Sequence, residues 1–188
     1  MKRERSKALN PTLWRTCRTL TGTTRLALLR RLLRKPGQTV SQLAEAEQVS
    51  MPRASQELRR LQSRGLLRAE RRRGYVRYHP EPDPQVATAR PILAALGRDR
   101  EWLATGAAER IRRLAAGASY ERRLDLLREL KKGPRDAPAL RAAAGQPAIS
   151  LYRHLYELRR CGWVTQERRR WRLAANGHPL ARGLRKLI

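Results

Sequence analysis

The same basic tetrapeptide, Glu-Arg-Arg-Arg, occurs at residues 70–73 and again at residues 167–170. Arginine carries a lasting positive charge on a planar fork that donates two hydrogen bonds at once, which suits phosphate oxygens and the edge of guanine. Repetition of the cluster favours binding of an anionic polymer over a charged turn that only keeps the protein soluble. The candidate contacts are Arg71, Arg72, Arg73, Arg168, Arg169 and Arg170.

A second group of polar residues precedes each cluster on a predicted helix. Ala54, Leu58 and Leu61 are spaced to face a core, which leaves a polar outer face in the first copy. Glutamine pairs with adenine and arginine with guanine in the major groove of DNA; a merely solvated helix face is the alternative interpretation. The outer-face candidates are Ser50, Arg53, Ser55, Gln56, Arg59 and Arg60 in the first copy, and Ser150, Tyr152, Arg153 and Tyr156 in the second.

The residue types that catalyse reactions or bind metals are sparse. The histidines and cysteines show no ligand-like spacing, and we find no Gly-rich phosphate loop, nucleophile elbow or zinc-protease motif. The few acidic residues lie within reach of arginines, where ion pairing explains them. We therefore expect no enzyme activity, no metal site and no cofactor.

The charge balance supports a nucleic-acid partner. The 188 residues include 43 Lys and Arg but only 16 Asp and Glu, giving a net charge of +27, and the excess is divided almost evenly between residues 1–83 and 84–188. Charge built into both halves favours a folded binder over a basic tail. No segment has the apolar length of a signal peptide or membrane span, and so we expect a cytoplasmic, nucleoid-associated protein.

An internal repeat organises the chain. Arg25–Arg30 matches Arg123–Arg128, and the pattern Leu58-x-x-Leu61-x-x-x-Gly65 recurs 97 residues later, in the same order as the arginine clusters. Each copy predicts three helices followed by a two-stranded hairpin, which is the winged helix-turn-helix arrangement.

The predicted elements of the first copy begin with an opening helix over residues 11–20. A helix capped by Thr23 or Thr24, a short helix capped by Ser41 and a third capped by Ser50 follow. The extended segments 66–70 and 75–79 flank a turn at residues 71–74. Thereafter we expect helices over 85–96 and 99–116.

The second copy predicts helices over 120–130, 138–144 and 148–160, strands at 163–165 and 171–173, and a last helix over 179–188. The flanking helices serve as lids on the cores or as dimer surfaces. The fold class is thus mostly α with small β-hairpins: an α+β protein with tandem winged helix-turn-helix domains, at residues 1–97 and 98–188.

The first copy resembles the ArsR-type winged-helix transcription regulators. The resemblance covers roughly residues 11–96, and it extends less fully to roughly 118–188. The segments that carry it are Leu13–Arg18, Thr24–Leu29, Val40–Ala44, Ser50–Leu61, Arg64–Leu67, Leu151–Leu155 and Gly162–Val164.

The resemblance implies a bacterial or archaeal regulator that binds DNA, commonly as a homodimer, and in many members releases it when a metal binds. This sequence differs from the family in holding two copies in one chain and in lacking its paired-cysteine metal motif. The first difference favours an intramolecular pseudo-dimer, with a homodimer as the alternative, and the second argues against metal sensing.

These observations lead to one main hypothesis and two alternatives. The main hypothesis is a transcription regulator that reads double-stranded DNA with two recognition helices and arginine-rich wings, on an asymmetric site. The alternatives are a replication-initiator-like DNA-binding protein and a winged-helix module for RNA or protein interaction, since charge alone binds both DNA and RNA.

Overall fold

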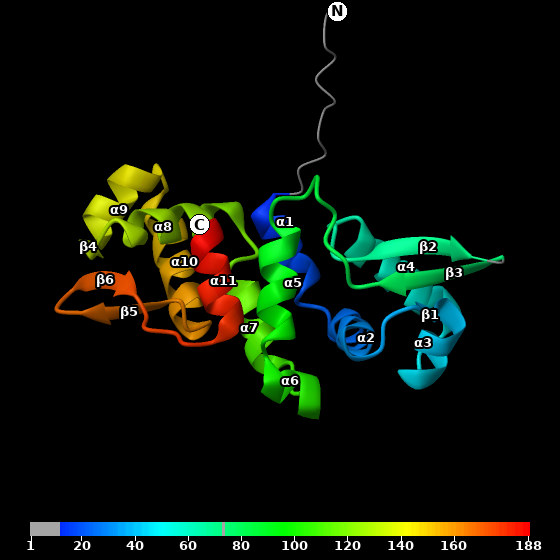
Figure 1. Ribbon diagram of the computed structural model, residues 1–188. Coiled ribbons are helices and arrows are strands. Elements are labelled where there is room, and N and C mark those ends of the chain that lie inside the picture. The colour runs from blue at the N-terminus through cyan, green and yellow to red at the C-terminus, as the bar shows by residue number, and fades with distance from the viewer. Residues whose placement is uncertain (1–11, 73) are drawn as a thin grey trace, which may run out of the picture.

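The computed structural model describes residues 12–72 and 74–188, which form a mainly helical α+β fold (Figure 1). Pro11, the predicted start of the opening helix, and Arg73, a predicted contact, lie outside the described residues. Among the described helices, none combines the length and the apolar character needed to cross a bilayer.

Both repeats show the same order of elements, as the sequence predicts. The first consists of α1 (Leu13–Thr19), α2 (Thr23–Arg34), β1 (Gln38–Thr39), α3 (Val40–Ala46), α4 (Met51–Gln62), β2 (Arg68–Arg72), β3 (Tyr75–His79) and α5 (Ala89–Gly97). The second consists of α7 (Glu109–Gly117), α8 (Glu121–Lys131), β4 (Arg135–Asp136), α9 (Ala137–Ala144), α10 (Ala148–Arg160), β5 (Val164–Glu167), β6 (Arg170–Leu173) and α11 (Pro179–Leu187).

Each repeat contains a small antiparallel sheet, ordered β1-β3-β2 in the first and β4-β6-β5 in the second. The two-residue strands β1 and β4 are absent from the sequence predictions. Each lies just before a short helix, where it pairs with the second strand of the hairpin, and thereby ties the hairpin to the helices.

The spacing of apolar residues accounts for α4 and α10. Ala54, Leu58 and Leu61 are fully buried, and Pro52 occupies the first turn of α4, where its missing N–H costs nothing. Gly65 then adopts a left-handed φ of 68° and turns the chain into the hairpin. The observed bounds of α10 agree with the prediction.

For the short helix α3, the predicted N-terminal cap, Ser41, is wrong by two residues. Thr39, not Ser41, precedes the first turn of α3: its hydroxyl accepts a hydrogen bond from the Gln42 N–H, and the Gln42 side chain accepts one from the Thr39 N–H. This reciprocal capping box satisfies two N–H groups, which a cap at Ser41 would leave without partners.

Two flanking helices also differ from the predictions. The single helix expected over residues 99–116 is two helices, α6 (Arg100–Thr105) and α7, because Gly106 takes a left-handed φ of 81° and ends α6. The helix expected from Gln85 begins only at Ala89, after a turn that follows Pro84.

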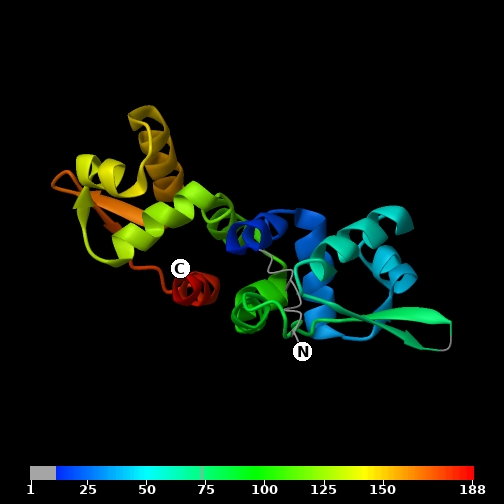
Figure 2. The same ribbon diagram turned by 90° about the horizontal axis from the view of Figure 1, so that it is seen from above.

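The flanking helices pack repeat against repeat. α1 contacts α7 and α5 contacts α11, so that helices in equivalent positions meet (Figures 1 and 2). A Cβ on Gly183 would lie 2.9 Å from the Ala95 Cβ, which shows how closely α11 approaches α5. The flanking helices, expected to be lids on the cores or dimer surfaces, therefore form the contact between the two repeats.

Polar contacts reinforce the contact between the repeats. The Arg30 guanidinium donates to the carbonyl oxygens of Leu103 and Ala104, at 3.1 and 2.8 Å, near the end of α6. The Arg112 Nε donates to the Thr21 carbonyl oxygen at 3.2 Å. Buried Asp99 and His178, which cap α6 and α11, lie 2.9 Å apart between Oδ2 and Nε2.

Candidate nucleic-acid interface

The outer face of α4 is polar, exposed and hollowed. Of the predicted contacts, Ser50, Arg53, Gln56, Arg59 and Arg60 are exposed, whereas Ser55 is half-buried. A shallow hollow of about 860 Å³ follows this face, and its lining includes Arg53, Gln56, Arg59 and Arg60. The structure thus brings four predicted side chains to one surface.

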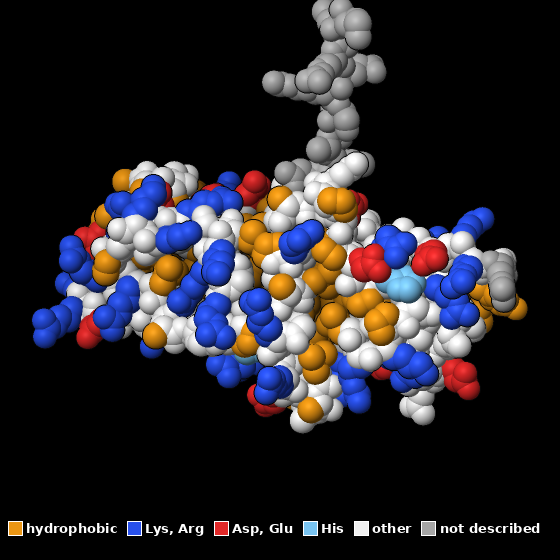
Figure 3. Space-filling view, in the orientation of Figure 1, with side chains coloured by type: hydrophobic (Ala, Val, Ile, Leu, Met, Phe, Trp, Pro, Cys, Tyr) orange, Lys and Arg blue, Asp and Glu red, His pale blue; other side chains and the backbone are white. Residues whose placement is uncertain are grey.

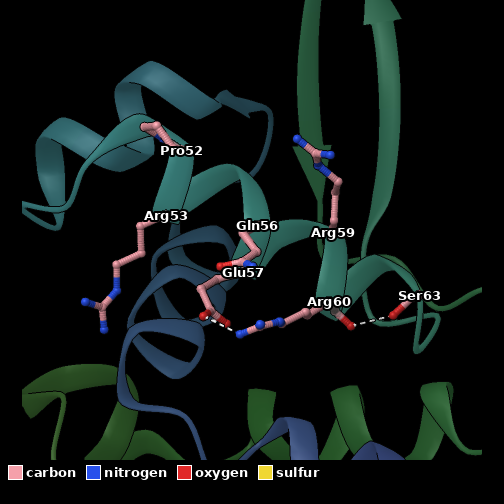
Figure 4. Close-up of a pocket in the computed structure, with 7 residues that line it drawn as sticks. All are labelled: Pro52, Arg53, Gln56, Glu57, Arg59, Arg60 and Ser63. Atoms are coloured by element: carbon pink, nitrogen blue, oxygen red, sulfur yellow. Dashed lines mark hydrogen bonds and ion pairs between the residues drawn. The ribbon is translucent and has the colours of Figure 1, made fainter.

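Short-range contacts hold the arginines of α4 in place. Glu57 lies between Arg60 of α4 and Arg25 of α2, 2.8 Å from the Arg60 Nη1 and 3.4 Å from the Arg25 Nη1. Arg53 donates to the Thr24 hydroxyl at 3.2 Å, on the opposite side of α4 from Arg59 (Figure 4).

Arg59 donates to the Ser55 hydroxyl at 2.9 Å. It also lines a second hollow, between α4 and β2. The guanidinium groups of α4 are therefore spread around its exposed face, while Gln56 occupies the middle (Figure 4).

Burial affects one of these charges. The Arg25 side chain is largely covered, and this desolvation lowers its pKa from the ordinary value; the Glu57 carboxylate opposes the effect and Arg60 adds to it. Its Nε is buried and has no hydrogen-bond acceptor among the described residues. A nearby anion would stabilise the charged form of this partly desolvated guanidinium.

The outer face of α10 differs from that of α4. Tyr152, Arg153 and Tyr156 are exposed as predicted, but Ser150 is half-buried. Ile149, which the sequence pattern did not single out, is 88% exposed and lies on the same face. The sequence could have indicated this, because Ile149 is apolar but does not fall on the helical positions that face the core. The second face is therefore more apolar than the first.

Beneath this face, the second repeat replaces an ion pair by an aromatic contact. His154 stands where the first repeat has Glu57, and its ring lies 5.9 Å from that of Tyr120. Arg123, the equivalent of Arg25, lies over the Tyr120 ring at 5.2 Å. Burial lowers the pKa of His154, and the positive charge of Arg123 lowers it further.

The first hairpin corrects the predicted turn. Arg71 and Arg72 belong to β2, where they pair with Val76 and Tyr75. Successive side chains of a strand point to opposite faces, so the two arginines do not form one cluster at a tip. Both are exposed.

The second hairpin is shorter and carries its arginines in the turn. Glu167 pairs with Arg170, which leaves Arg168 and Arg169 as a two-residue connection with φ values of 46° and 65°. Two left-handed residues in succession form the tight turn that suits the twist of a hairpin, but Asn and Gly are its usual occupants. All three arginines are exposed. Arg71 and Arg72, which lie in a strand, therefore differ in conformation from their repeat equivalents Arg168 and Arg169.

The two exposed helices, α4 and α10, share one side of the molecule. Seen from above, α4 and α10 lie on the side away from α5 and α11, with a hairpin toward each end (Figure 2). Basic side chains also cover the side that carries α5 and α11 (Figure 3). Charge alone does not identify the interface, so the positions of the exposed helices and hairpins are needed as well.

The described residues contain no group of three or more His, Cys, Asp and Glu side chains that would hold a metal. His79, His154 and His178 lie in separate places, and both cysteines are buried and free. Burial raises the pKa of the Cys17 thiol to about 12. A thiol in this state is a poor nucleophile and metal ligand at neutral pH.

Comparison of the chain with known protein families, curated proteins and solved structures found no match.

Proposed function

We propose that the protein is a DNA-binding transcription regulator in which each repeat acts as a winged helix. α4 and α10 serve as recognition helices in the major groove, and the two hairpins serve as wings along the backbone. The observation that carries the proposal is the exposure of α4 and α10 on one side of the chain, each with an arginine-bearing hairpin beside it (Figure 2).

The contacts between repeats support an intramolecular pseudo-dimer. A two-fold dimer brings equivalent surfaces of two subunits together, and the pairs α1–α7 and α5–α11 do this within one chain. Each repeat would then read one half-site, with centres about 34 Å apart along the duplex. Because α4 is polar and α10 is partly apolar, the two half-sites differ in sequence.

The proposal assigns separate roles to helices and hairpins. Gln56 in the middle of the α4 face reads a base, and the exposed arginines of the hairpins contact phosphates. The Gln56→Ala variant is expected to relax preference at one base position, by about 1–3 kcal/mol of discrimination. Gln62→Ala, which changes an exposed glutamine at the end of α4, is the matched control.

Selection from random duplexes, followed by footprinting, tests this function. Two unequal protected segments one helical turn apart are expected, with the altered base preference confined to Gln56→Ala. Competition between duplex DNA and structured RNA at fixed salt is the decisive comparison. Equal binding of both, with no enriched sequence, would contradict the proposal.

An interaction module is the second candidate, and one observation favours it. Ile149, Tyr152 and Tyr156 form an apolar row on the exposed face of α10, such as occurs where proteins bind partners. Under this alternative, replacing Tyr152 and Tyr156 by Ser leaves the affinity for selected duplexes unchanged. Under the main proposal, the double variant loses preference at one half-site only.

A further inference from the structure

Each repeat has a basic hollow between its first helix and the end of its exposed helix. In the first repeat, the α1/α4 hollow has a volume of about 390 Å³. Its lining includes two hydroxyl-bearing threonines, a serine and the arginines Arg15, Arg18, Arg25, Arg60 and Arg64.

The second repeat repeats this feature in the equivalent place. The α7/α10 hollow, of about 340 Å³, is lined by Arg110, Arg113 and Arg160 together with smaller groups. Arg113 is the repeat equivalent of Arg15, and each hollow adjoins the end of the exposed helix. Among the residues that the structure describes, no carboxylate lines either hollow.

The two hollows lie between the exposed helices. α1 contacts α7, and these two helices lie between α4 and α10 (Figure 2). The α1/α4 hollow also shares Arg60 and Ser63 with the hollow along the face of α4. The basic surface is thus continuous from the candidate interface to the middle of the molecule.

The described part of the chain balances only some of this charge. Glu57 and Glu157 neutralise Arg60 and Arg160, and Arg15 lies over the Trp14 ring at 5.0 Å. Over residues 12–72 and 74–188, neither Arg18 nor Arg64 has an ion-pair partner within 4.0 Å.

The helical spacing aligns several of these charges. Arg15 and Arg18 are three residues apart on α1, as Arg110 and Arg113 are on α7, so each pair shares one face of its helix. Like charges held together in this way repel one another, and phosphates relieve the repulsion.

From these observations we propose that the α1/α4 and α7/α10 hollows bind phosphates of the duplex backbone in the middle of the site, between the two half-sites. The inference rests on the proposed function and extends it to arginines of α1 and α7, which belong neither to the recognition helices nor to the hairpins. Arginine suits this role because its fork binds two phosphate oxygens at once. These contacts fix the protein on the duplex without reading bases.

The test variant replaces Arg15, Arg18, Arg110 and Arg113 by Gln. Each phosphate contact contributes about 0.9 to the slope of log K against log salt, so the loss of four lowers the slope by about 3 to 4. The central phosphates should lose protection in a hydroxyl-radical footprint, while both outer segments remain protected.

The matched control makes the same change of charge elsewhere. Arg90, Arg98, Arg182 and Lys186 are exposed residues of α5, α11 and the turn after α5. Their replacement by Gln should leave the slope and the central protection unchanged. Equal losses in both variants, or an unprotected centre in the wild type, would overturn the inference.

Two further results separate the possible failures. Absence of duplex binding by the wild type would refute the proposed function itself, whereas normal half-site protection with an unprotected centre refutes only this inference. Pyrophosphate is titrated into the free protein as a small-ligand probe. Saturable micromolar binding that the quadruple variant lacks would assign the hollows to a free phosphate ligand and reject the backbone contact.

Discussion

The tight turn at Arg168 and Arg169 allows a prediction in which stability and DNA binding change in opposite directions. Both residues have left-handed backbones, which cost an L-residue other than Gly or Asn about 1 kcal/mol or more. In the Arg168→Asn/Arg169→Gly variant, the usual residues of this turn type occupy both positions. Part of this stabilisation is lost because glycine increases the conformational entropy of the unfolded chain.

We expect a net stabilisation of about 1 kcal/mol, which raises the midpoint of thermal unfolding by about 2–4 °C for a chain of this size. DNA binding should weaken, and the slope of log K against log salt should fall by about 2, because two phosphate contacts are removed. Calorimetry and binding titrations over a range of salt concentrations measure the two effects.

The Arg71→Gln/Arg72→Gln variant provides the control. It removes two charges from the other hairpin, where neither residue has a positive φ. It should weaken binding by a similar amount without raising the unfolding temperature. The reasoning is wrong if the turn variant is less stable than the wild type, or if it binds duplex DNA with an unchanged salt slope.

Two other predictions concern the contact between the repeats. The Gly183→Leu variant should lose about 1–3 kcal/mol of unfolding free energy, because a Cβ there would lie 2.9 Å from the Ala95 Cβ, whereas Gly177→Ala, with no neighbour within 4 Å, should change little in the same urea titration. Burial lowers the pKa of His178 below its ordinary 6.5 despite the nearby Asp99 carboxylate, so the unfolded chain binds the proton first and stability falls as the pH drops below about 6.5. The His178→Asn variant keeps a side chain that caps α11 but does not titrate. Its unfolding free energy, measured in urea between about pH 7.5 and about pH 5, should depend less on pH than that of the wild type. An equal pH dependence of the two proteins would contradict this assignment.

Sequence periodicity was sufficient for the central helices. The buried spacing of Leu151, Leu155 and Leu158 gives α10 its observed bounds, since a row of leucines at helical intervals allows only one face to be covered. The outer faces followed from the same reasoning. The candidates on α4 are exposed except for Ser55, whose hydroxyl Arg59 contacts along the helix.

The hairpins were harder because a run of arginines contains no register signal. With no alternation of apolar and polar residues at 71–73 or 168–170, the sequence does not indicate where a strand ends and a turn begins. The strands β1 and β4, which pair with the second strand of each hairpin, are likewise too short to show a pattern.

The partners of the flanking helices were also beyond periodicity. Apolar spacing on the last helix predicts a buried face but does not indicate what covers it, and its closest neighbour is α5, far away in the sequence. Nor does the sequence indicate that Asp99 and His178 form a pair, because the two residues are far apart along the chain. The arginines of α1 and α7 are spaced three residues apart, which places each pair on one face of its helix. This spacing points to a shared site only once the two helices are known to be in contact.

The equivalent helix pairs α1–α7 and α5–α11 join the two repeats within one polypeptide. This arrangement affects how the occupancy of a DNA site would depend on protein concentration when the protein is scarce. Two separate subunits come apart on dilution, so their occupancy of an operator falls steeply once their concentration drops below that needed for association. Here the second half is tethered at a high effective concentration that does not depend on the number of molecules present. Under the proposed function, occupancy of a DNA site should therefore vary linearly with protein level when sites are mostly vacant.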